Sequence, residues 1–251
     1  MVAPNGYKMA FMPRLSLVIP VFNEQDNLER LRSEIREAMS AVTDDYEVVA
    51  TDDASWDRSW EILREIAEHD PHWRAQRFAE NCGESAASAA GMKAATGEVI
   101  ITLDADLQND PKDIPKFLEA LKTADCVCGS RAHERADNWL RRVSSSIANG
   151  VRNKLSDENI SDAGCTYRAF KRECLRDIKF FRGAHRFLPT LFRMEGRKVV
   201  EIAITPRERF AGESKYGIWN RLFKTFVDLL AIRWMKSRRL RYQIADRKGQ
   251  T

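Results

Sequence analysis

The first half of the chain alternates short apolar runs with longer segments in which apolar residues recur at helical spacing. The short runs predict buried strands at 15–22, 46–52, 75–80, 98–104 and 125–130, and the longer segments predict helices at 27–41, 58–70, 84–95 and 112–123. Small side chains dominate 84–95, so we expect that helix to pack closely against a neighbour. This alternation predicts an α/β fold, with a single Rossmann-like, mostly parallel sheet flanked by helices.

Polar side chains follow the predicted strands at the points where the strands end. In open sheets of this kind, ligands bind at the carboxyl ends of the strands. The residues expected to share this edge are Asn23 and Glu24, Asp52 and Asp53, Asp104 and Asp106, and Arg131. Four strand ends thus bring charge to one edge, which indicates a binding site there.

The fourth apolar run ends in two aspartates, Asp104 and Asp106, separated by one residue. In an extended segment residues i and i+2 point to the same side, so both carboxylates can reach one point, where they repel each other. Mg²⁺ or Mn²⁺ would relieve this repulsion, because both ions prefer oxygen ligands, and Gln108 could add an amide oxygen. The alternative is a solvated turn that caps the next helix, near Pro111.

Two common phosphate-binding motifs are missing from the sequence. There is no GxxxxGK[ST] loop and no GxGxxG after the first predicted strand. A P-loop NTPase and a dinucleotide dehydrogenase are therefore disfavoured, and a diphosphate bridged by a metal ion remains.

Composition adds an uneven charge distribution to this picture. The 251 residues suffice for one large α/β domain or two small ones, with a net charge of +4. Residues 1–125 hold 13 Lys and Arg against 24 Asp and Glu, whereas residues 126–251 hold 28 against 13. The acidic half could bind a cation, and the basic half could bind nucleic acid, a lipid phosphate or a membrane surface.

The number of cysteines and the hydropathy of the chain indicate the cellular compartment in which the protein works. The five cysteines are odd in number and form no CxxC pair, which favours a reducing cytoplasm over a disulfide framework or a zinc site. We also expect neither a signal peptide nor a membrane-spanning segment, because no run of 18 uncharged apolar residues occurs.

Five segments, taken in order, resemble the signature segments of family 2 glycosyltransferases. They are "LSLVIPVFNEQDNL", "TDDASWDRS", "FAENCGESAASAAGMKAATGEVIITLDADLQNDP", "SDAGCTYRAFKREC" and "RFAGESKYG". Within that family they most resemble the polyprenyl-phosphate glycosyltransferases, the dolichyl- or undecaprenyl-phosphate sugar synthases. The resemblance covers roughly residues 15–217. It implies a GT-A fold and an inverting, metal-dependent transfer of a sugar from a nucleotide diphosphosugar.

The resemblance also implies roles for individual residues. The nucleoside pocket would be lined by Pro20, Phe22 and Glu24, and Asp53, with Asp52 beside it, would bind the base or ribose. Asp104, Asp106 and Gln108 would hold the metal ion and the donor diphosphate. The acceptor phosphate would face Arg131 and Arg142, and a mobile loop with Arg209, Ser214 and Lys215 would close over the diphosphate. Two positions depart from the family pattern: Ala54 replaces the glycine of DDGS, and Pro206 stands where His or Asn is usual.

The nature of the acceptor follows from acid–base chemistry. A sugar hydroxyl needs a general base, usually Asp or Glu, whereas a phosphate monoester is already an anion and needs cations instead. In "DAGCTYRAFKR" the only nearby acid is Asp162, which could position a neighbour or act as a base. We therefore expect a polyprenyl phosphate acceptor. The alternatives are a sugar-hydroxyl acceptor, an inactive relative, and a basic nucleic-acid-binding module, for which no zinc-finger or RNP-like motif is present.

The C-terminal segment predicts an amphipathic helix within 217–243. Its apolar residues at helical spacing are Trp219, Leu222, Phe223, Phe226, Leu229 and Leu230, with Arg221, Lys224 and Asp228 on the other side and Lys236, Arg238, Arg239 and Arg241 at the end. Such a helix is typical of peripheral attachment to a membrane, here the cytoplasmic face. The alternative is a helix packed on its own domain. An integral membrane partner or a second copy of the chain could also provide attachment.

These expectations divide the chain into three parts. Residues 1–14 form an N-terminal extension, 15–216 the GT-A domain and 217–251 a basic, membrane-associating tail. Near the expected acceptor side, His185 opens a further predicted helix, where it could contact the acceptor or diphosphate or serve a structural role.

Overall fold

The computed structural model describes residues 14–131, 162, 165–205, 207 and 218–239, with only the backbone of 218–225. The strands are β1 (Leu15–Val21), β2 (Tyr46–Asp52), β3 (Trp73–Arg77), β4 (Val99–Thr102), β5 (Cys126–Ser130), β6 (Arg168–Lys171) and β7 (Val199–Ala203). The α-helices are α1 (Leu28–Ser40), α2 (Ser59–His69), α3 (Glu84–Ala94), α4 (Ile114–Leu121), α6 (Leu188–Met194) and α7 (Ile218–Ser237). Short 3₁₀ turns are η1 (Pro111–Asp113), η2 (Arg172–Leu175) and η3 (Ala184–Arg186).

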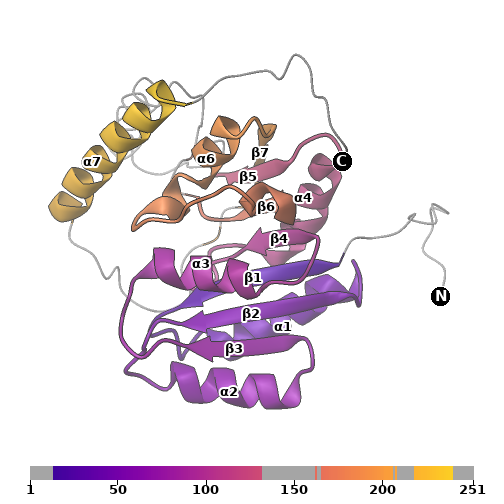
Figure 1. The fold of residues 1–251 in the computed structure, drawn as a ribbon. Coiled ribbons are helices and arrows are strands. Elements are labelled where there is room, and N and C mark those ends of the chain that lie inside the picture. The colour runs from indigo at the N-terminus through magenta and orange to yellow at the C-terminus, as the bar shows by residue number, and fades with distance from the viewer. Residues whose placement is uncertain (1–13, 132–161, 163–164, 206, 208–217, 240–251) are drawn as a thin grey trace, which may run out of the picture.

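The strands form one mixed sheet in the order β3-β2-β1-β4-β6-β5-β7, shown in Figure 1. All neighbouring strands run parallel except at β6, which is antiparallel to both β4 and β5. The predicted mostly parallel sheet is therefore confirmed. The carboxyl ends of β1, β2 and β4 lie together at one edge of the sheet, as the strand-end argument requires.

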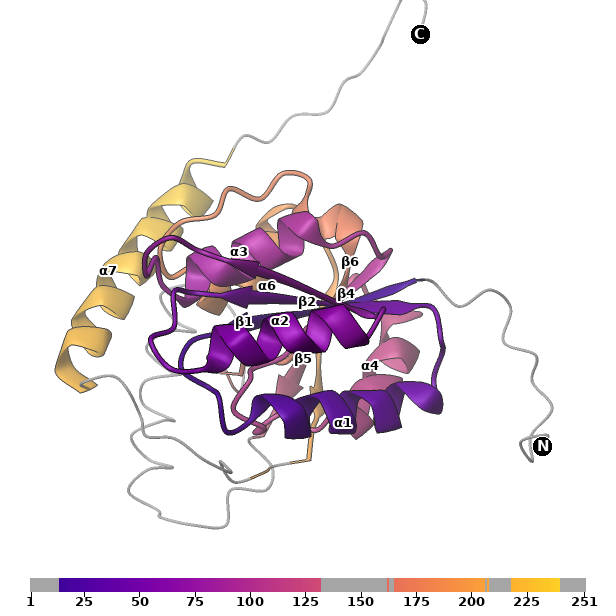
Figure 2. The same ribbon diagram turned by 90° about the horizontal axis from the view of Figure 1, so that it is seen from below.

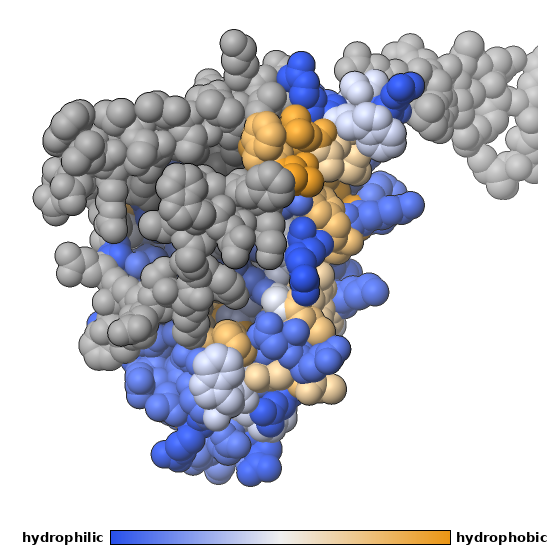
Figure 3. All heavy atoms as spheres, turned by 90° about the vertical axis from the view of Figure 1, so that its left-hand side faces the viewer, coloured by the Kyte–Doolittle hydropathy of each residue, from blue (hydrophilic) through white to orange (hydrophobic). Residues whose placement is uncertain are grey.

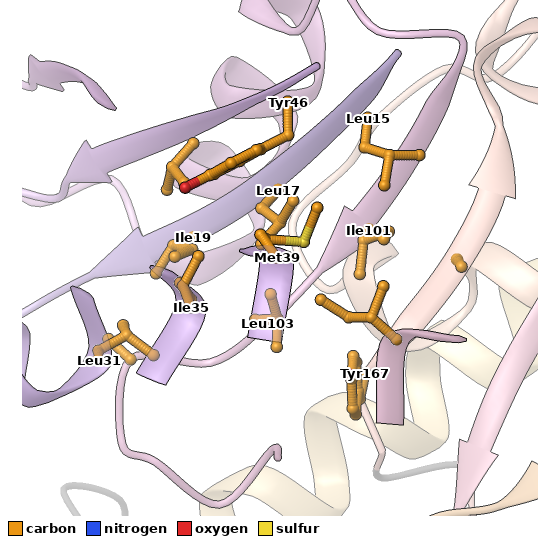
Figure 4. Packing of buried hydrophobic residues seen from close by; sticks show 14 of the residues in the cluster. Leu15, Leu17, Ile19, Leu31, Ile35, Met39, Tyr46, Ile101, Leu103 and Tyr167 are labelled. Carbon is orange, nitrogen blue, oxygen red and sulfur yellow. The ribbon is translucent and has the colours of Figure 1, made fainter. Parts of the chain in front are cut away.

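Helices cover both faces of the sheet. Figure 2 shows α3 on one face and α1 and α4 on the other. Leu17 and Ile19 of β1 pack with Ile35 of α1 in the core that Figure 4 shows, whereas Val18 belongs to a second cluster on the α3 side. A strand buried on both faces needs apolar residues at successive positions, which is why β1 reads as a continuous apolar run.

The small-residue helix α3 packs closely against the sheet, as predicted. A Cβ atom at Gly91 would lie 2.5 Å from Cγ1 of Val18 and 3.3 Å from Oγ1 of Thr51. Only glycine fits at this approach of helix to strand. The close packing at Gly91 holds α3 against β1 and β2, and the first turn of this helix borders the site described below.

Several element boundaries differ from the prediction. The strand expected at 75–80 is β3 at Trp73–Arg77, and the one expected at 98–104 is β4 at Val99–Thr102. The helix expected at 112–123 begins as η1 and continues as α4. Strands β6 (RAFK) and β7 (VVEIA) were not predicted, because each is short and carries charge within the run.

The predicted C-terminal helix is present as α7, and its described side chains divide between two faces. Leu229 and Ile232 are buried in a cluster with Phe187 and Leu191. An outer stripe remains exposed: Phe226, Val227, Leu230, Trp234 and Met235. Asp228, expected on the polar side, instead lies against Gly183, where a Cβ atom would stand 2.7 Å from its Oδ2. Within the described ranges, no helix has the length and apolar content needed to cross a bilayer.

Candidate active site

Backbone strain gathers at the carboxyl edge of the sheet. Among the described residues, three that are not glycine have positive φ: Asn23 at 54°, Ala54 at 58° and Leu107 at 63°. They lie in the loops that follow β1, β2 and β4 respectively. Left-handed backbone is costly for residues with a Cβ atom and is typical of functional loops. The strain therefore marks the same edge at which the polar residues were expected to meet.

The turn after β4, which we call the acidic turn (Asp104 to Gln108), carries the paired aspartates. Its backbone is fixed locally, because Asn109 Oδ1 accepts from the Asp104 N–H at 2.9 Å and Asp106 Oδ1 accepts from the Gln108 N–H at 3.1 Å. Thr166 donates its hydroxyl hydrogen bond to Oδ2 of Asp104. The remaining carboxylate oxygens are thus held in defined directions, close to the end of a buried strand.

The acidic turn carries more negative charge than its surroundings neutralise. Burial raises the pKa of Asp104 to about 7, with further contributions from the charges of Glu84 and then Asp106, and an opposing one from the Thr166 hydrogen bond. A carboxyl group with such a pKa gains from a bound cation, which replaces the proton. Glu84, the first residue of α3, was not predicted from the sequence as part of this site.

His185 joins Glu84 to the turn before α6. Its Nε2 lies 3.4 Å from Oε1 of Glu84, and its Nδ1 lies 2.6 Å from Oγ of Ser85. The same Ser85 hydroxyl accepts from the N–H of Gly183 at 2.7 Å. His185 is buried, and its backbone carbonyl accepts from Arg168. Of the two roles left open by the sequence, this geometry supports the structural one: the imidazole fixes the first turn of α3 beside the acidic turn.

Arg131 lies on the other side of the acidic turn, directly after β5. Its guanidinium and backbone both donate to Asp162, with Nε at 3.0 Å from Oδ2. Burial is the largest single effect on Arg131 and lowers its pKa. The charge and hydrogen bond of Asp162, and to a smaller extent the charge of Asp104, outweigh burial and raise the pKa above its ordinary value. The charge of Asp104 thus acts on Arg131, which indicates that the guanidinium lies near the acidic turn.

Asp52 and Asp53, at the end of β2, are committed to internal contacts. Asp53 accepts from the backbone N–H groups of Cys82 at 2.7 Å and Gly83 at 2.8 Å, so it holds the two residues that immediately precede α3. Asp52 accepts from the N–H of Ser55 at 3.2 Å and pairs with Nε of Arg77 at 3.1 Å. Burial raises the pKa of Asp53, although the backbone hydrogen bonds oppose the shift. Both acids shape the edge of the site by holding its loops.

The end of β1 and the residues after it lie beside the end of β2 and its loop. Pro20 pairs in register with Thr51, and Glu24 accepts from Nδ2 of Asn27 at 2.6 Å. The ring of Phe22 meets that of Trp56 edge to face, with centroids 4.9 Å apart. These contacts hold the loops after β1 and β2 against each other at the carboxyl edge of the sheet.

Of the remaining predicted site residues, one lies among the residues that the structure describes. Gln108 lies in the acidic turn, and Arg142, Arg209, Ser214 and Lys215 lie outside the described residues. Two residues that act on Asp104 were missed, Thr166 and Glu84. His185 was singled out from the sequence, but its contact with Ser85 was not predicted. Thr166 and Asp104 are 62 positions apart, and Ser85 and His185 are 100 apart, so no local pattern could pair them.

The donor set suits a divalent cation that completes its shell with substrate oxygens. Within the described ranges, no group of three or more His, Cys, Asp or Glu side chains converges as a metal site. Two carboxylates at the acidic turn nevertheless fit Mg²⁺ or Mn²⁺, because these ions commonly combine one or two carboxylates with substrate phosphates. The raised pKa of Asp104 points the same way.

Solved structures share this architecture. A mannosyltransferase from Pyrobaculum calidifontis, determined with GDP-mannose and Mn²⁺, is 21% identical, with a TM-score of 0.62 over 93% of this chain and 68% of its own. Glucosyl-3-phosphoglycerate synthase from Mycobacterium tuberculosis, determined with Mn²⁺, UDP and phosphoglyceric acid, is 18% identical, with a TM-score of 0.64 over 89% and 78%. The fold is the expected GT-A fold.

Sequence comparison places the chain within a family. The model of glycosyl transferase family 2 matches residues 16–179, and the chain belongs to this family. An undecaprenyl-phosphate 4-deoxy-4-formamido-L-arabinose transferase from Edwardsiella ictaluri is 38% identical over 218 residues, which cover 86% of this chain and 66% of the relative. The transferase of the same name from Aeromonas hydrophila is 35% identical over 217 residues, with the same coverage. The chain thus spans about two thirds of the length of these relatives.

Proposed function

We propose that this protein transfers a sugar, with inversion, from a nucleotide diphosphosugar to a polyprenyl phosphate. The observation that carries the proposal is the arrangement of opposite charges at the carboxyl edge. The acidic turn suits a cation and the donor diphosphate, and Arg131 beside it suits an incoming phosphate. The names of the curated relatives, which are undecaprenyl-phosphate sugar transferases, support the same substrate classes.

The reaction would be a single displacement. An oxygen of the polyprenyl phosphate forms a bond to the anomeric carbon while the bond from that carbon to the diphosphate oxygen breaks, and the electron pair leaves with the nucleoside diphosphate. A bound divalent cation would supply Lewis-acid stabilisation of the departing diphosphate. No proton has to be removed from the nucleophile, since a phosphate monoester is ionised near neutral pH.

The residues of this chain have distinct tasks in that displacement. Asp104 and Asp106 would hold the cation, and Thr166 orients the carboxylate of Asp104. Arg131, held by Asp162, would offset the repulsion between the incoming phosphate and the donor. Asp162 is occupied by the guanidinium, which favours its role as a positioning residue over that of a general base.

We further propose that α7 rests on the cytoplasmic face of a membrane. Its inner residues Leu229 and Ile232 attach it to the domain, and its outer stripe remains exposed. In Figure 3 hydrophobic atoms gather in the upper part of the face that bears α7. Arg238 and Arg239 follow the stripe and match an anionic lipid surface. A polyprenyl acceptor, which stays in the bilayer, requires such contact.

The transfer is tested with the purified chain, vesicles that contain undecaprenyl phosphate, Mn²⁺ and a panel of radiolabelled UDP-, GDP-, dTDP- and CDP-sugars. We expect one donor to yield label that extracts into organic solvent together with free nucleoside diphosphate. Label that remains in a water-soluble glycoside would instead establish a sugar-hydroxyl acceptor. No turnover with any donor, in protein that binds Mn²⁺ and vesicles, would overturn the proposed activity.

Membrane contact is tested by flotation with vesicles of anionic or neutral lipid at low salt. We expect binding to anionic vesicles, and much weaker binding when Leu230 and Trp234 are both replaced by Ser. Equal flotation of wild type and variant would show that the outer stripe is not the contact surface.

A further inference from the structure

Trp56 is an exposed aromatic side chain at the edge of the candidate site. It is 79% exposed, more than any other large hydrophobic residue that the structure describes. It lies four positions beyond Asp52, the last residue of β2, and therefore at the carboxyl edge of the sheet. A single exposed apolar residue is common on protein surfaces, so exposure alone would mean little.

The loop that carries Trp56 is held rigidly, however. The N–H of Trp56 donates to Oδ1 of Asn23 at 3.0 Å, and the N–H of Asn23 donates to Oγ of Ser55 at 2.9 Å. These two hydrogen bonds connect the loop after β2 with the loop after β1. Ala54, immediately before Ser55, has left-handed backbone. A loop whose backbone is held in place before any ligand arrives loses little freedom when the ligand binds.

Phe22 completes an aromatic corner, by which we mean Phe22 and Trp56. The two rings meet at 89° with centroids 4.9 Å apart, so the edge of one ring supports the face of the other. This arrangement leaves broad aromatic surface open to solvent at Trp56. Flat heterocycles stack on such surfaces.

The order of the strands indicates which ligand group would reach this corner. β1 alone separates β2 from β4, so the loop after β2 lies about 10 Å along the sheet from the acidic turn. Arg131 follows β5, on the opposite side of β4. The edge thus has an aromatic end, an acidic centre and a cationic end.

A nucleotide diphosphosugar can occupy this edge in one direction. Its diphosphate belongs at the acidic centre with a cation, and the acceptor phosphate belongs at the cationic end beside Arg131. The nucleoside is left to extend toward β2, where the aromatic corner offers a stacking surface.

We propose that Trp56, supported by Phe22, stacks on the nucleobase of the sugar donor. The inference rests on the proposed function and adds to it a binding residue for the donor base. Stacking is tolerant of base identity, since every base has a π face, so Trp56 would strengthen nucleotide binding without selecting the base.

The test compares a nucleotide with a ligand that lacks the base. Calorimetry with Mn²⁺ measures the affinity of wild type, Trp56→Phe and Trp56→Ala for inorganic pyrophosphate and for whichever of UDP, GDP, dTDP and CDP wild type binds most tightly. For Trp56→Ala we expect nucleoside diphosphate affinity to fall by about 5- to 100-fold, and for Trp56→Phe by less. Pyrophosphate affinity should be the same in all three proteins.

Trp234→Ala is the matched control, because Trp234 is also a largely exposed tryptophan, at 63%, but lies on α7. Its nucleoside diphosphate affinity should equal that of wild type. Unchanged nucleotide affinity in Trp56→Ala would overturn the inference and leave the proposed function intact, and so would an equal loss of pyrophosphate affinity. If Trp56→Ala fails to fold, Trp56→Phe and Trp56→Leu carry the same comparison. A wild-type protein that binds none of the four nucleotides would refute the proposed function itself.

Discussion

Asp162 accepts two hydrogen bonds from Arg131, one from the backbone N–H at 3.3 Å and one from Nε at 3.0 Å. The carboxylate therefore fixes both the chain direction after β5 and the plane of the guanidinium. Asp162 is itself buried, so its charge is balanced mainly by a close partner and not by water. Arg131 can meet an incoming phosphate only in the direction that this pair allows.

Replacing Asp162 with Asn should impair use of the acceptor. A hydrogen bond between charged groups contributes about 1.5–3 kcal/mol, so kcat/KM for the polyprenyl phosphate should fall by about 10- to 100-fold. The affinity for the donor nucleotide should not change, because Arg131 lies away from the β2 side. Steady-state kinetics with varied acceptor, together with calorimetry of the nucleotide, separates the two effects.

A suitable control for that experiment is Glu173→Gln, which removes an ion pair with Arg197 of similar length, 2.9 Å, at an exposed position. Exposed pairs contribute little, so activity should be that of wild type. If Asp162→Asn lowered donor affinity as strongly as acceptor use, Arg131 would not act on the acceptor side.

Asp104→Asn should abolish both transfer and cation-dependent stabilisation. The lost Lewis-acid effect of several kcal/mol corresponds to a fall in kcat of about 10³-fold or more. Without metal, the melting temperature should stay equal or rise, because the substitution removes a carboxyl whose charged form is disfavoured by burial and by Glu84. Melting curves with and without Mn²⁺ measure this, and Asp44→Asn, at an exposed position, serves as the control. Stabilisation by Mn²⁺ equal to that of wild type would place the cation elsewhere.

Ala54→Gly should stabilise the protein. Ala54 has φ of 58°, a conformation that costs a residue with a Cβ atom about 1–2 kcal/mol, whereas glycine adopts it freely at an entropic cost of about 0.5–1 kcal/mol. The free energy of unfolding in urea should therefore rise by about 0.5–1 kcal/mol. Ala120→Gly, inside α4, should change it in the opposite direction by about 1 kcal/mol. A destabilised Ala54→Gly variant would mean that the alanine methyl group makes contacts that outweigh the strain.

Glu47 should make stability depend on pH in acid. The carboxylate is buried and accepts from Ser16, Thr96 and Arg74, which together overcome the opposing effect of burial and lower its pKa from 4.5 to about 2. A depressed pKa contributes stability that is present above pH 4.5 and is lost as pH falls toward 2. At about 1.4 kcal/mol per pKa unit, the contribution is about 3 kcal/mol.

Urea unfolding at pH 7, 4 and 2.5 measures this contribution. Glu47→Gln should be less stable than wild type at pH 7, and the difference should shrink as the pH falls. Glu37→Gln, which removes an exposed pair with Lys112, should follow the wild-type curve. A difference between Glu47→Gln and wild type that persists undiminished at pH 2.5 would show that charge is not its origin.

The features that could be predicted from the sequence are those formed by residues that are contiguous in the chain. The range of β2 was predicted to the residue, because all seven of its side chains are buried and apolar residues dominate its centre. Asp104 and Asp106 were found because both follow one strand. β6 escaped prediction because Arg168, a charged residue, is buried within it and donates to the backbone of His185.

The partners of the aspartates were beyond prediction for a different reason. Thr166 and Glu84 reach the acidic turn only because β6 inserts antiparallel between β4 and β5, and α3 returns across the sheet. Neither event leaves a periodic signal in the residues themselves. The substitution of Ala54 for glycine was visible in the sequence, but its left-handed backbone was not.

Figures 1 and 2 agree that α7 and the carboxyl ends of β1 and β2 lie on the same side of the molecule. Attachment by the outward residues of that helix would turn the reacting edge toward the lipid headgroups. The search for an acceptor would then be a two-dimensional one, by lateral diffusion, and the hydrocarbon tail would never be drawn into water. Leu229 and Ile232 are buried against the body of the protein. The height of the site above the bilayer would therefore be fixed by the packing of α7 and not by the length of a flexible linker.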